Sequence, residues 1–107
     1  MKQGDVYWHT FRAPDKRRPV LILTRSAIIP LLTGVTVAPI TTNIRNLPTE
    51  VFLSPEDGLF EDCAVNLDNI QTLPKSNLGE YIVTLEPEVM REVRAAISFA
   101  FDFKAMK

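Results

Sequence analysis

The sequence predicts a mainly β domain, a small barrel or sandwich followed by one C-terminal helix. Short runs of β-branched and aromatic residues recur along most of the chain, separated by Pro, Gly, Asn and Asp. After residue 86 the apolar residues recur at three- and four-residue steps, the period of a helix. The 107 residues, 46% of them hydrophobic, suit a single folded domain over residues 1–107.

Three strands are expected in the N-terminal half, over residues 6–11, 20–24 and 35–41. Pro19 is expected at the first position of the second strand, where its missing N–H can face away from the ladder. The cations before it would then belong to a loop over residues 12–18. Residues 25–34 are expected to form a loop whose apolar stretch, 27–32, covers the core or makes an association surface.

Four shorter strands are expected in the second half, over residues 50–53, 63–67, 70–73 and 79–83. A dense turn cluster at 54–58 separates the first two of them. The helix is expected to begin at Pro87, which suits the first helical position. One apolar stripe should pack on the sheet, formed by Met90, Val93, Ile97 and Phe101.

Charge is distributed unevenly along a chain whose net charge is only −1. Residues 1–25 hold six cations and two anions, giving +4, and the remainder carries −5. This asymmetry predicts a localised anion site on an acidic body. The densest positive stretch is Lys16-Arg17-Arg18, although by itself such a cluster is more typical of a solvated loop.

Several classes of protein are disfavoured by composition. One cysteine, Cys63, permits no internal disulfide, and with a single histidine it cannot complete a common zinc set. Cys63 is expected to be a small buried hydrophobe, and no metal or cofactor is expected. The N-terminus has no apolar signal region and no apolar run approaches about 20 residues. We therefore expect a soluble cytoplasmic protein without a membrane partner.

Two strand ends carry side chains suited to a phosphate. Pro19 restricts Arg18 to an extended backbone, which fixes the origin of a planar guanidinium that can make two parallel bonds to an anion. Thr41 and Thr42 end the third strand, where a hydroxyl can bind a phosphate or ribose oxygen, or simply bond the turn. Asn43 and Arg45 extend that loop towards a nucleic-acid backbone.

Other polar and aromatic residues have less distinctive surroundings. His9 is the one histidine and a candidate base, but without a defined partner it is more typical of a half-buried strand residue. Asp68-Asn69 is typical of an ordinary turn. The rings of Tyr7, Trp8 and Phe60 can stack on bases, although core packing is expected for two of the three.

Four blocks, in this order and spacing, resemble the MazF/PemK/Kid family of toxin endoribonucleases. They are Gly4-Asp5-Val6-Tyr7-Trp8, Arg17-Arg18-Pro19-Val20-Leu21-Ile22, Val37-Ala38-Pro39-Ile40-Thr41-Thr42-Asn43, and Leu67-Asp68-Asn69-Ile70-Gln71-Thr72-Leu73-Pro74-Lys75-Ser76-Asn77-Leu78. The resemblance extends from residue 4 to about residue 101. It implies a compact SH3-like β-barrel with a C-terminal α-helix, usually a homodimer. It also implies metal-independent, sequence-specific cleavage of single-stranded RNA, growth inhibition, and neutralisation by a cognate antitoxin.

The resemblance also implies roles for individual residues. Arg18 and Thr41 match the catalytic positions, and Asp68 matches an acidic position whose role varies among relatives. Gln71 stands where the family commonly has an arginine. The hypothesis is attack by the RNA's own 2′-hydroxyl, leaving a 2′,3′-cyclic phosphate and a 5′-hydroxyl. The residues expected to bind RNA are Lys16, Arg17, Thr42, Asn43 and Arg45.

Two alternatives remain beside the ribonuclease. A gyrase-inhibiting toxin shares the barrel, but Arg18 and Thr41 stand where the nuclease needs them. A non-catalytic module that binds RNA or antitoxin is conceivable because of Gln71. The expected antitoxin has an acidic, partly disordered tail, which would bind the +4 segment and the apolar loop 27–32 and so exclude RNA.

Overall fold

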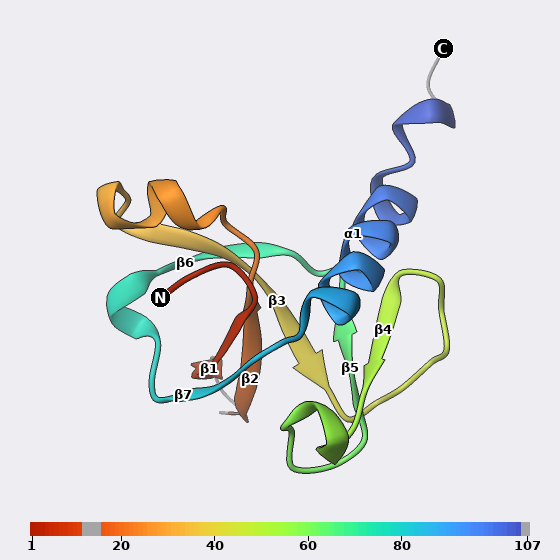
Figure 1. The fold of residues 1–107 in the computed structure, drawn as a ribbon, viewed down its shortest axis with the longest axis horizontal. Helices are drawn as coiled ribbons and strands as arrows, with labels where there is room; N and C mark the ends of the chain where they lie inside the picture. Colours follow the sequence, from red (N-terminus) through yellow and green to blue (C-terminus); the bar gives the residue numbers. More distant parts are fainter. Residues whose placement is uncertain (12–15, 106–107) are drawn as a thin grey trace.

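The computed structural model describes residues 1–11 and 16–105, and it confirms the mainly β fold with one C-terminal helix (Figure 1). Its antiparallel strands form a sheet of order β4-β5-β3-β2-β1-β7, in which β6 also pairs with β3. The sheet curls into a half-barrel. The strands are β1 (Asp5–Phe11), β2 (Lys16–Ile22), β3 (Gly34–Thr41), β4 (Glu50–Leu53), β5 (Cys63–Asn66), β6 (Gln71–Pro74) and β7 (Tyr81–Thr84).

β2 begins at Lys16, four residues before the expected strand, and ends at Ile22. The expectation that Lys16, Arg17 and Arg18 lie in a loop is therefore wrong. Strand β1 continues to Phe11, which pairs with Lys16, so the ladder holds the cations in extended backbone. Positions 12–15 of the expected loop lie outside the described residues.

Pro19 consequently lies inside β2 and not at its start, opposite Trp8. The Trp8 N–H donates to the Glu80 carbonyl and the Trp8 carbonyl accepts from the Gly79 N–H, so both groups face away from β2. Trp8 and Pro19 thus form a non-hydrogen-bonded pair, in which neither strand needs a donor from the other. The missing N–H of Pro19 costs the β1–β2 ladder no hydrogen bond.

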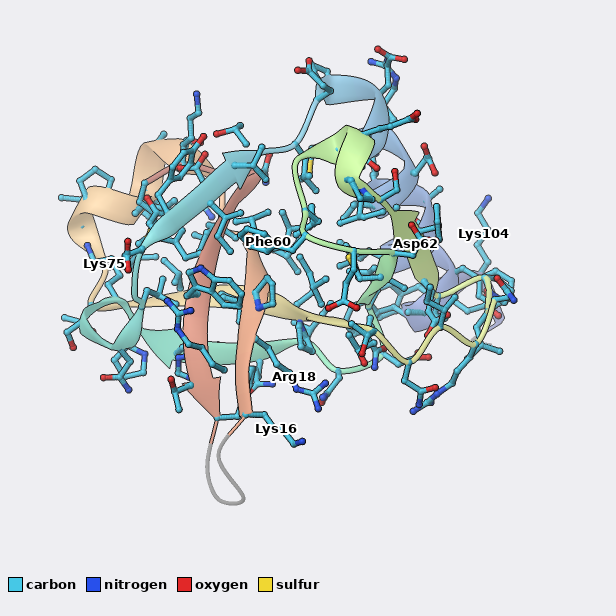
Figure 2. The ribbon with its side chains drawn as sticks, turned by 90° about the horizontal axis from the view of Figure 1, so that it is seen from below. Lys16, Arg18, Phe60, Asp62, Lys75 and Lys104 are labelled. Carbon is cyan, nitrogen blue, oxygen red and sulfur yellow. The ribbon has the colours of Figure 1, made fainter. Side chains whose placement is uncertain are left out.

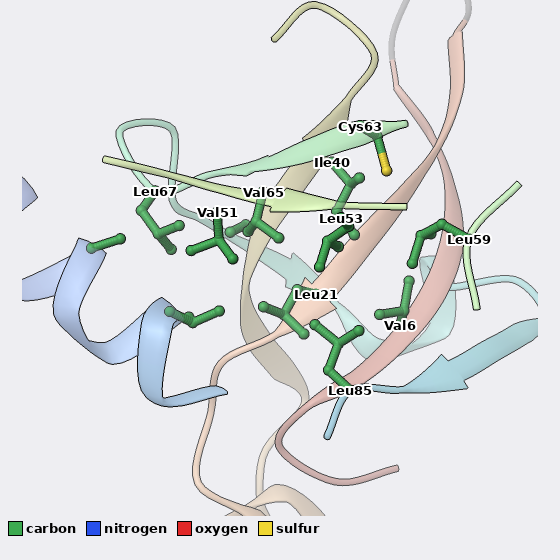
Figure 3. Packing of buried hydrophobic residues seen from close by; sticks show 13 residues of the cluster. Val6, Leu21, Ile40, Val51, Leu53, Leu59, Cys63, Val65, Leu67 and Leu85 are labelled. Carbon is green, nitrogen blue, oxygen red and sulfur yellow. The ribbon is translucent and has the colours of Figure 1, made fainter. Parts of the chain in front are cut away.

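Side chains of β2 alternate between two hydrophobic cores, because successive residues of a strand point to opposite faces. Leu21 belongs to the larger core, with Val6, Ile40 and Leu53 (Figure 3). Val20 and Ile22 belong to a smaller core on the other face. The same alternation continues outwards to Lys16, Arg17 and Arg18 and decides which way each cation points.

The helix α1 (Pro87–Phe101) begins at Pro87 as expected and contacts β4. Val93 is buried and Ile97 is partly buried against the larger core, which confirms most of the expected stripe. The expectation that Phe101 belongs to this stripe is wrong, because its ring is 54% exposed and stacks on Phe103. The C-terminal end of α1 projects beyond the sheet in Figure 1.

The apolar segment 27–32 lies in a short 3-10 helix, η1 (Ser26–Leu31). It does cover the core, because Ile29 is buried in the smaller core, but Leu31 remains 79% exposed. η1 follows the end of β2 opposite to Lys16. The apolar loop and the cations are therefore separate patches and not one surface. Three further 3-10 helices are η2 (Pro55–Asp57), η3 (Lys75–Asn77) and η4 (Phe103–Ala105).

The strands of the second half match their expected positions to within two residues, and β4 matches at both ends. Among the described residues, no helix is long and apolar enough to cross a membrane.

Candidate active site

Arg18 and Thr41 are brought together by the pairing of β2 with β3. Val20 pairs with Pro39, and continuing that antiparallel register by two residues places Arg18 opposite Thr41. The guanidinium Nη1 of Arg18 donates to the Thr41 hydroxyl oxygen at 3.3 Å. Both side chains are partly buried. Two residues 23 positions apart in sequence therefore form one polar unit at a strand end.

The Thr41 hydroxyl oxygen accepts a second hydrogen bond, from the Asn43 backbone N–H at 3.1 Å. A hydroxyl has two acceptor sites and one donor hydrogen. With both acceptor sites engaged by Arg18 and Asn43, its hydrogen is left to donate to a third group. An oxygen of a bound phosphate is a suitable acceptor, and Arg18 would then contact the same anion.

One cavity beside Arg18 has a volume of about 410 Å³ and a lining rich in carboxamides. We call it the amide cavity. Its carboxamides come from the loop after β3 and from residues 66–71, and are those of Asn43, Asn66, Asn69 and Gln71. Lys16, Arg18 and Arg45 contribute three cations, and no carboxylate lines it among the described residues. Its electrostatic character therefore favours an anionic ligand.

A second cavity, of about 360 Å³, shares Lys16 and Arg18 with the first. We call it the aromatic cavity because Trp8 and Phe60 line it, their rings stacked at 5.4 Å and 16°. The Arg17 guanidinium carbon lies 4.1 Å from the Trp8 ring centroid, a cation–π distance. Figure 2 shows Lys16 at the start of β2, with Arg18 and Phe60 further along the β1–β2 hairpin.

The alternation along β2 explains why two different cavities adjoin one arginine. Arg17 and Pro19 point to the face that carries Trp8, whereas Lys16 and Arg18 point to the face that carries Phe11. Lys16 and Arg18 also reach the rim of the aromatic cavity. Arg18 thus stands at the boundary between an aromatic and an amide-rich surface.

The other expected RNA-binding residues also line these cavities. Lys16 lines both, Arg17 and Thr42 line the aromatic cavity, and Asn43 and Arg45 line the amide cavity. Arg17 is not a free cation, because it also lies 3.9 Å from the Glu80 carboxylate.

Asp68 is not brought to Arg18. It is exposed, and its Oδ2 accepts a 2.6 Å hydrogen bond from the hydroxyl of Thr49, which is buried. Its backbone N–H donates to Asn66 Oδ1 at 2.9 Å, which closes the turn. Asp68 lines neither cavity. The geometry gives this carboxylate a structural partner and no contact with the Arg18–Thr41 unit.

His9 and Cys63 are packed as the sequence predicts. His9 is 8% exposed, its Nδ1 lies 3.3 Å from the Asn77 carbonyl, and its ring meets Phe11 edge-on. Cys63 lines the aromatic cavity, but burial, and then the Glu61, Asp62 and Asp57 carboxylates, raise the pKa of its thiol to about 11. A thiol with that pKa stays protonated at neutral pH and is a poor nucleophile.

Sequence reasoning missed Asn66 and Asn69 as site residues and treated Gln71 only as a lost cation. A signal was available, because Asn66 ends β5 and Gln71 begins β6, and both of these strands pair with β3. Both residues therefore lie along the same side of β3. Within residues 1–11 and 16–105, no group of three His, Cys, Asp or Glu side chains is placed to hold a metal ion.

Comparison with known proteins gives consistent matches. The family described as "PemK-like, MazF-like toxin of type II toxin-antitoxin system" matches residues 2–101. The chain is 49% identical over 88 residues to endoribonuclease MazF3 of Mycobacterium tuberculosis, covering 82% of this chain and 85% of the relative. The solved structure of M. tuberculosis toxin MazF-mt6 has a TM-score of 0.80 and 45% identity, covering 90% of this chain and 96% of that one. An endoribonuclease in complex with its cognate antitoxin, from a mycobacterial species, has a TM-score of 0.84 and 31% identity, covering 96% of each chain.

Proposed function

The chain belongs to the PemK/MazF family of toxin endoribonucleases of type II toxin–antitoxin systems, and we propose that it cuts single-stranded RNA at the Arg18–Thr41 unit. The observation that carries the proposal is the 3.3 Å hydrogen bond between these side chains at the boundary of two cation-lined cavities. A phosphodiester placed there would meet a guanidinium and a hydroxyl hydrogen together. We propose that the protein acts in the cytoplasm, because its substrate would be RNA and its one cysteine forms no disulfide.

The proposed reaction is a transesterification within the RNA. The 2′-oxygen forms a bond to phosphorus, the bond from phosphorus to the 5′-oxygen breaks, and the products carry a 2′,3′-cyclic phosphate and a 5′-hydroxyl. The 2′-hydroxyl proton leaves during attack, and the departing 5′-oxygen gains a proton. RNA supplies its own nucleophile, so the reaction selects RNA over DNA and needs no metal-bound water.

Arg18 has the main catalytic role in this proposal. Negative charge grows on the phosphorus oxygens in the transition state, and a preorganised donor stabilises it without reorganisation. Thr41 holds the Arg18 guanidinium and donates its own hydrogen to the same oxygens. We assign no proton transfer to His9, which is packed against Phe11, or to Asp68, which is bonded to Thr49.

The proposal is tested by cleavage of a long unstructured RNA in the presence of EDTA, with mapping of the new ends. We expect cleavage to continue, and we expect Arg18→Ala to slow it about 10²- to 10³-fold, the usual effect of removing one such donor. Arg25→Ala is the matched control, because Arg25 is exposed and lines neither cavity. Loss of activity with EDTA, or products with 3′-hydroxyl ends, would show the mechanism to be wrong.

We further propose that an acidic antitoxin tail occupies the same cation-lined cavities. Lys16, Arg18 and Arg45 offer it charge complementarity without an opposing carboxylate in the amide cavity. RNA and the tail should then compete, and simultaneous binding would contradict this steric form of inhibition.

A homodimer is proposed as well. The C-terminal end of the chain exposes a run of phenylalanines, with Phe99, Phe101 and Phe103 being 59%, 54% and 72% exposed. Exposed aromatic patches of this kind usually mark a contact surface. Light scattering coupled to size exclusion should give twice the mass of the 12.1 kDa chain.

A further inference from the structure

The two cavities beside Arg18 differ in what they offer a nucleotide. The amide cavity presents carboxamide groups, each with both hydrogen-bond donors and an acceptor. The aromatic cavity presents the stacked rings of Trp8 and Phe60. A single-stranded RNA whose phosphate lies on Arg18 has a base on either side of that phosphate. Each base therefore meets a surface of different chemistry.

The carboxamides are suited to read the edge of a base. Amide groups pair with base edges through a donor and an acceptor at once, which makes them selective among the bases. Within residues 1–11 and 16–105, the Asn69 and Gln71 side chains make no hydrogen bond, so their donors and acceptors are available to a ligand. Asn66 is different, because its Oδ1 already accepts from the Asp68 N–H, which takes one of its two acceptor sites.

The aromatic rings are suited to hold a base without selecting it. Every base has a π-face, so stacking on an aromatic side chain is tolerant of sequence. Phe60 is 67% exposed although it stacks on Trp8, which leaves ring surface open to a ligand. Arg17 lies against Trp8, so a phosphate next to the stacked base would also find a cation.

We propose that the two cavities divide the recognition of RNA: the amide cavity, through Asn69 and Gln71, selects the base on one side of the cut, and the aromatic cavity, through Phe60, stacks the base on the other side whatever its identity. The inference rests on the proposed ribonuclease function. It gives Gln71 a role of its own: a neutral reader of a base, where a cation is common in the family.

The experiment uses the full chain and a pool of single-stranded RNA with random sequence, and it sequences the cleaved ends. We expect Gln71→Met, which keeps length but removes the amide, and Asn69→Ala to lower the preference for one base beside the cut by about 10-fold. Phe60→Ala should slow cleavage about 10-fold at every site and leave the preferred sequence unchanged. Gln3→Ala, a carboxamide change outside both cavities, should alter neither.

The outcomes distinguish a failure of this inference from a failure of the proposed ribonuclease function. If the unmodified protein does not cut the pool, the ribonuclease function fails. If it cuts with a preferred sequence that Gln71→Met and Asn69→Ala both leave unchanged while circular dichroism shows them folded, the division of recognition is wrong. A changed sequence preference in Phe60→Ala would overturn the role of the aromatic cavity. Testing two amide variants keeps the result decisive if one of them does not fold.

Discussion

Replacing Thr41 by valine tests whether Arg18 and Thr41 act as one unit. Valine keeps the branched shape but removes the oxygen that accepts from Arg18 Nη1 at 3.3 Å and from the Asn43 N–H at 3.1 Å. The Asn43 N–H is in an exposed segment, where water replaces the lost acceptor. We therefore expect the free energy of unfolding to fall by only about 1 kcal/mol, the typical net value of a hydrogen bond.

Cleavage should suffer more than stability. The variant loses the hydroxyl hydrogen that would reach the phosphate, and it also loses the group that holds the guanidinium in place. Together these should lower the cleavage rate about 10²-fold, as for other lost transition-state donors. Thr41→Ser retains the oxygen, so it should keep the rate within about 10-fold of the unmodified protein.

The double variant Arg18→Ala/Thr41→Val decides the point. If Thr41 works largely through Arg18, the combined loss will be smaller than the product of the single losses by at least about 10-fold, because residues that act as a unit are not additive. The assay is single-turnover cleavage of a labelled RNA, with urea unfolding of each variant as the control for folding. Losses that simply multiply would refute the coupled unit, even if both single variants were slow.

Three other predictions follow from contacts in the structure. Asp68→Asn preserves an oxygen for the Thr49 hydroxyl, so cleavage should fall by less than about 10-fold; a loss above about 10²-fold would restore Asp68 as an acid or base. Gly58→Ala should lower the free energy of unfolding by about 1–3 kcal/mol in urea titration, because Gly58 has φ +96° and a Cβ there would lie 2.6 Å from Val83 Cγ2; Ser76→Ala is the exposed control, and equal stability of both variants would contradict the strain. With the pKa of Cys63 raised from 9.0 to about 11, the folded protein should resist iodoacetamide at pH 8 and react only on unfolding. For the same reason, the stabilisation linked to the protonated thiol should be present below pH 9 and decrease between pH 9 and 11, and rapid labelling of the folded chain at pH 8 would contradict both statements.

Much of the site could be predicted from sequence because its residues sit next to strong local signals. Pro19 restricts the backbone of Arg18, and Thr41 ends a short apolar run that is typical of a strand. Phe11 and Lys16 show where such reasoning fails. The charged run before Pro19 has loop composition, yet pairing with β1 extends the strand through it. A partner strand supplies hydrogen bonds that outweigh a weak local preference.

Local patterns in the sequence predicted most elements of this protein and marked Arg18 and Thr41 as its candidate site residues. It contains the apolar alternation of the strands, the start of α1 at Pro87, and the motif blocks that mark Arg18 and Thr41. These features are local, and backbone geometry and hydrophobic period are enough to express them.

The surroundings of Arg18 follow from strand pairing, which local sequence patterns do not specify. The register of β2 on β3 sets the Arg18–Thr41 contact, and the pairing of β5 and β6 with β3 brings Asn66 and Gln71 to the same side of β3. The tertiary structure also placed the Asp68 carboxylate against the Thr49 hydroxyl. Such contacts join residues that are far apart in the chain, and a one-residue change of register would point every side chain of a strand to the other face. Local sequence patterns do not specify the register, because the register depends on which face of each strand the two cores bury.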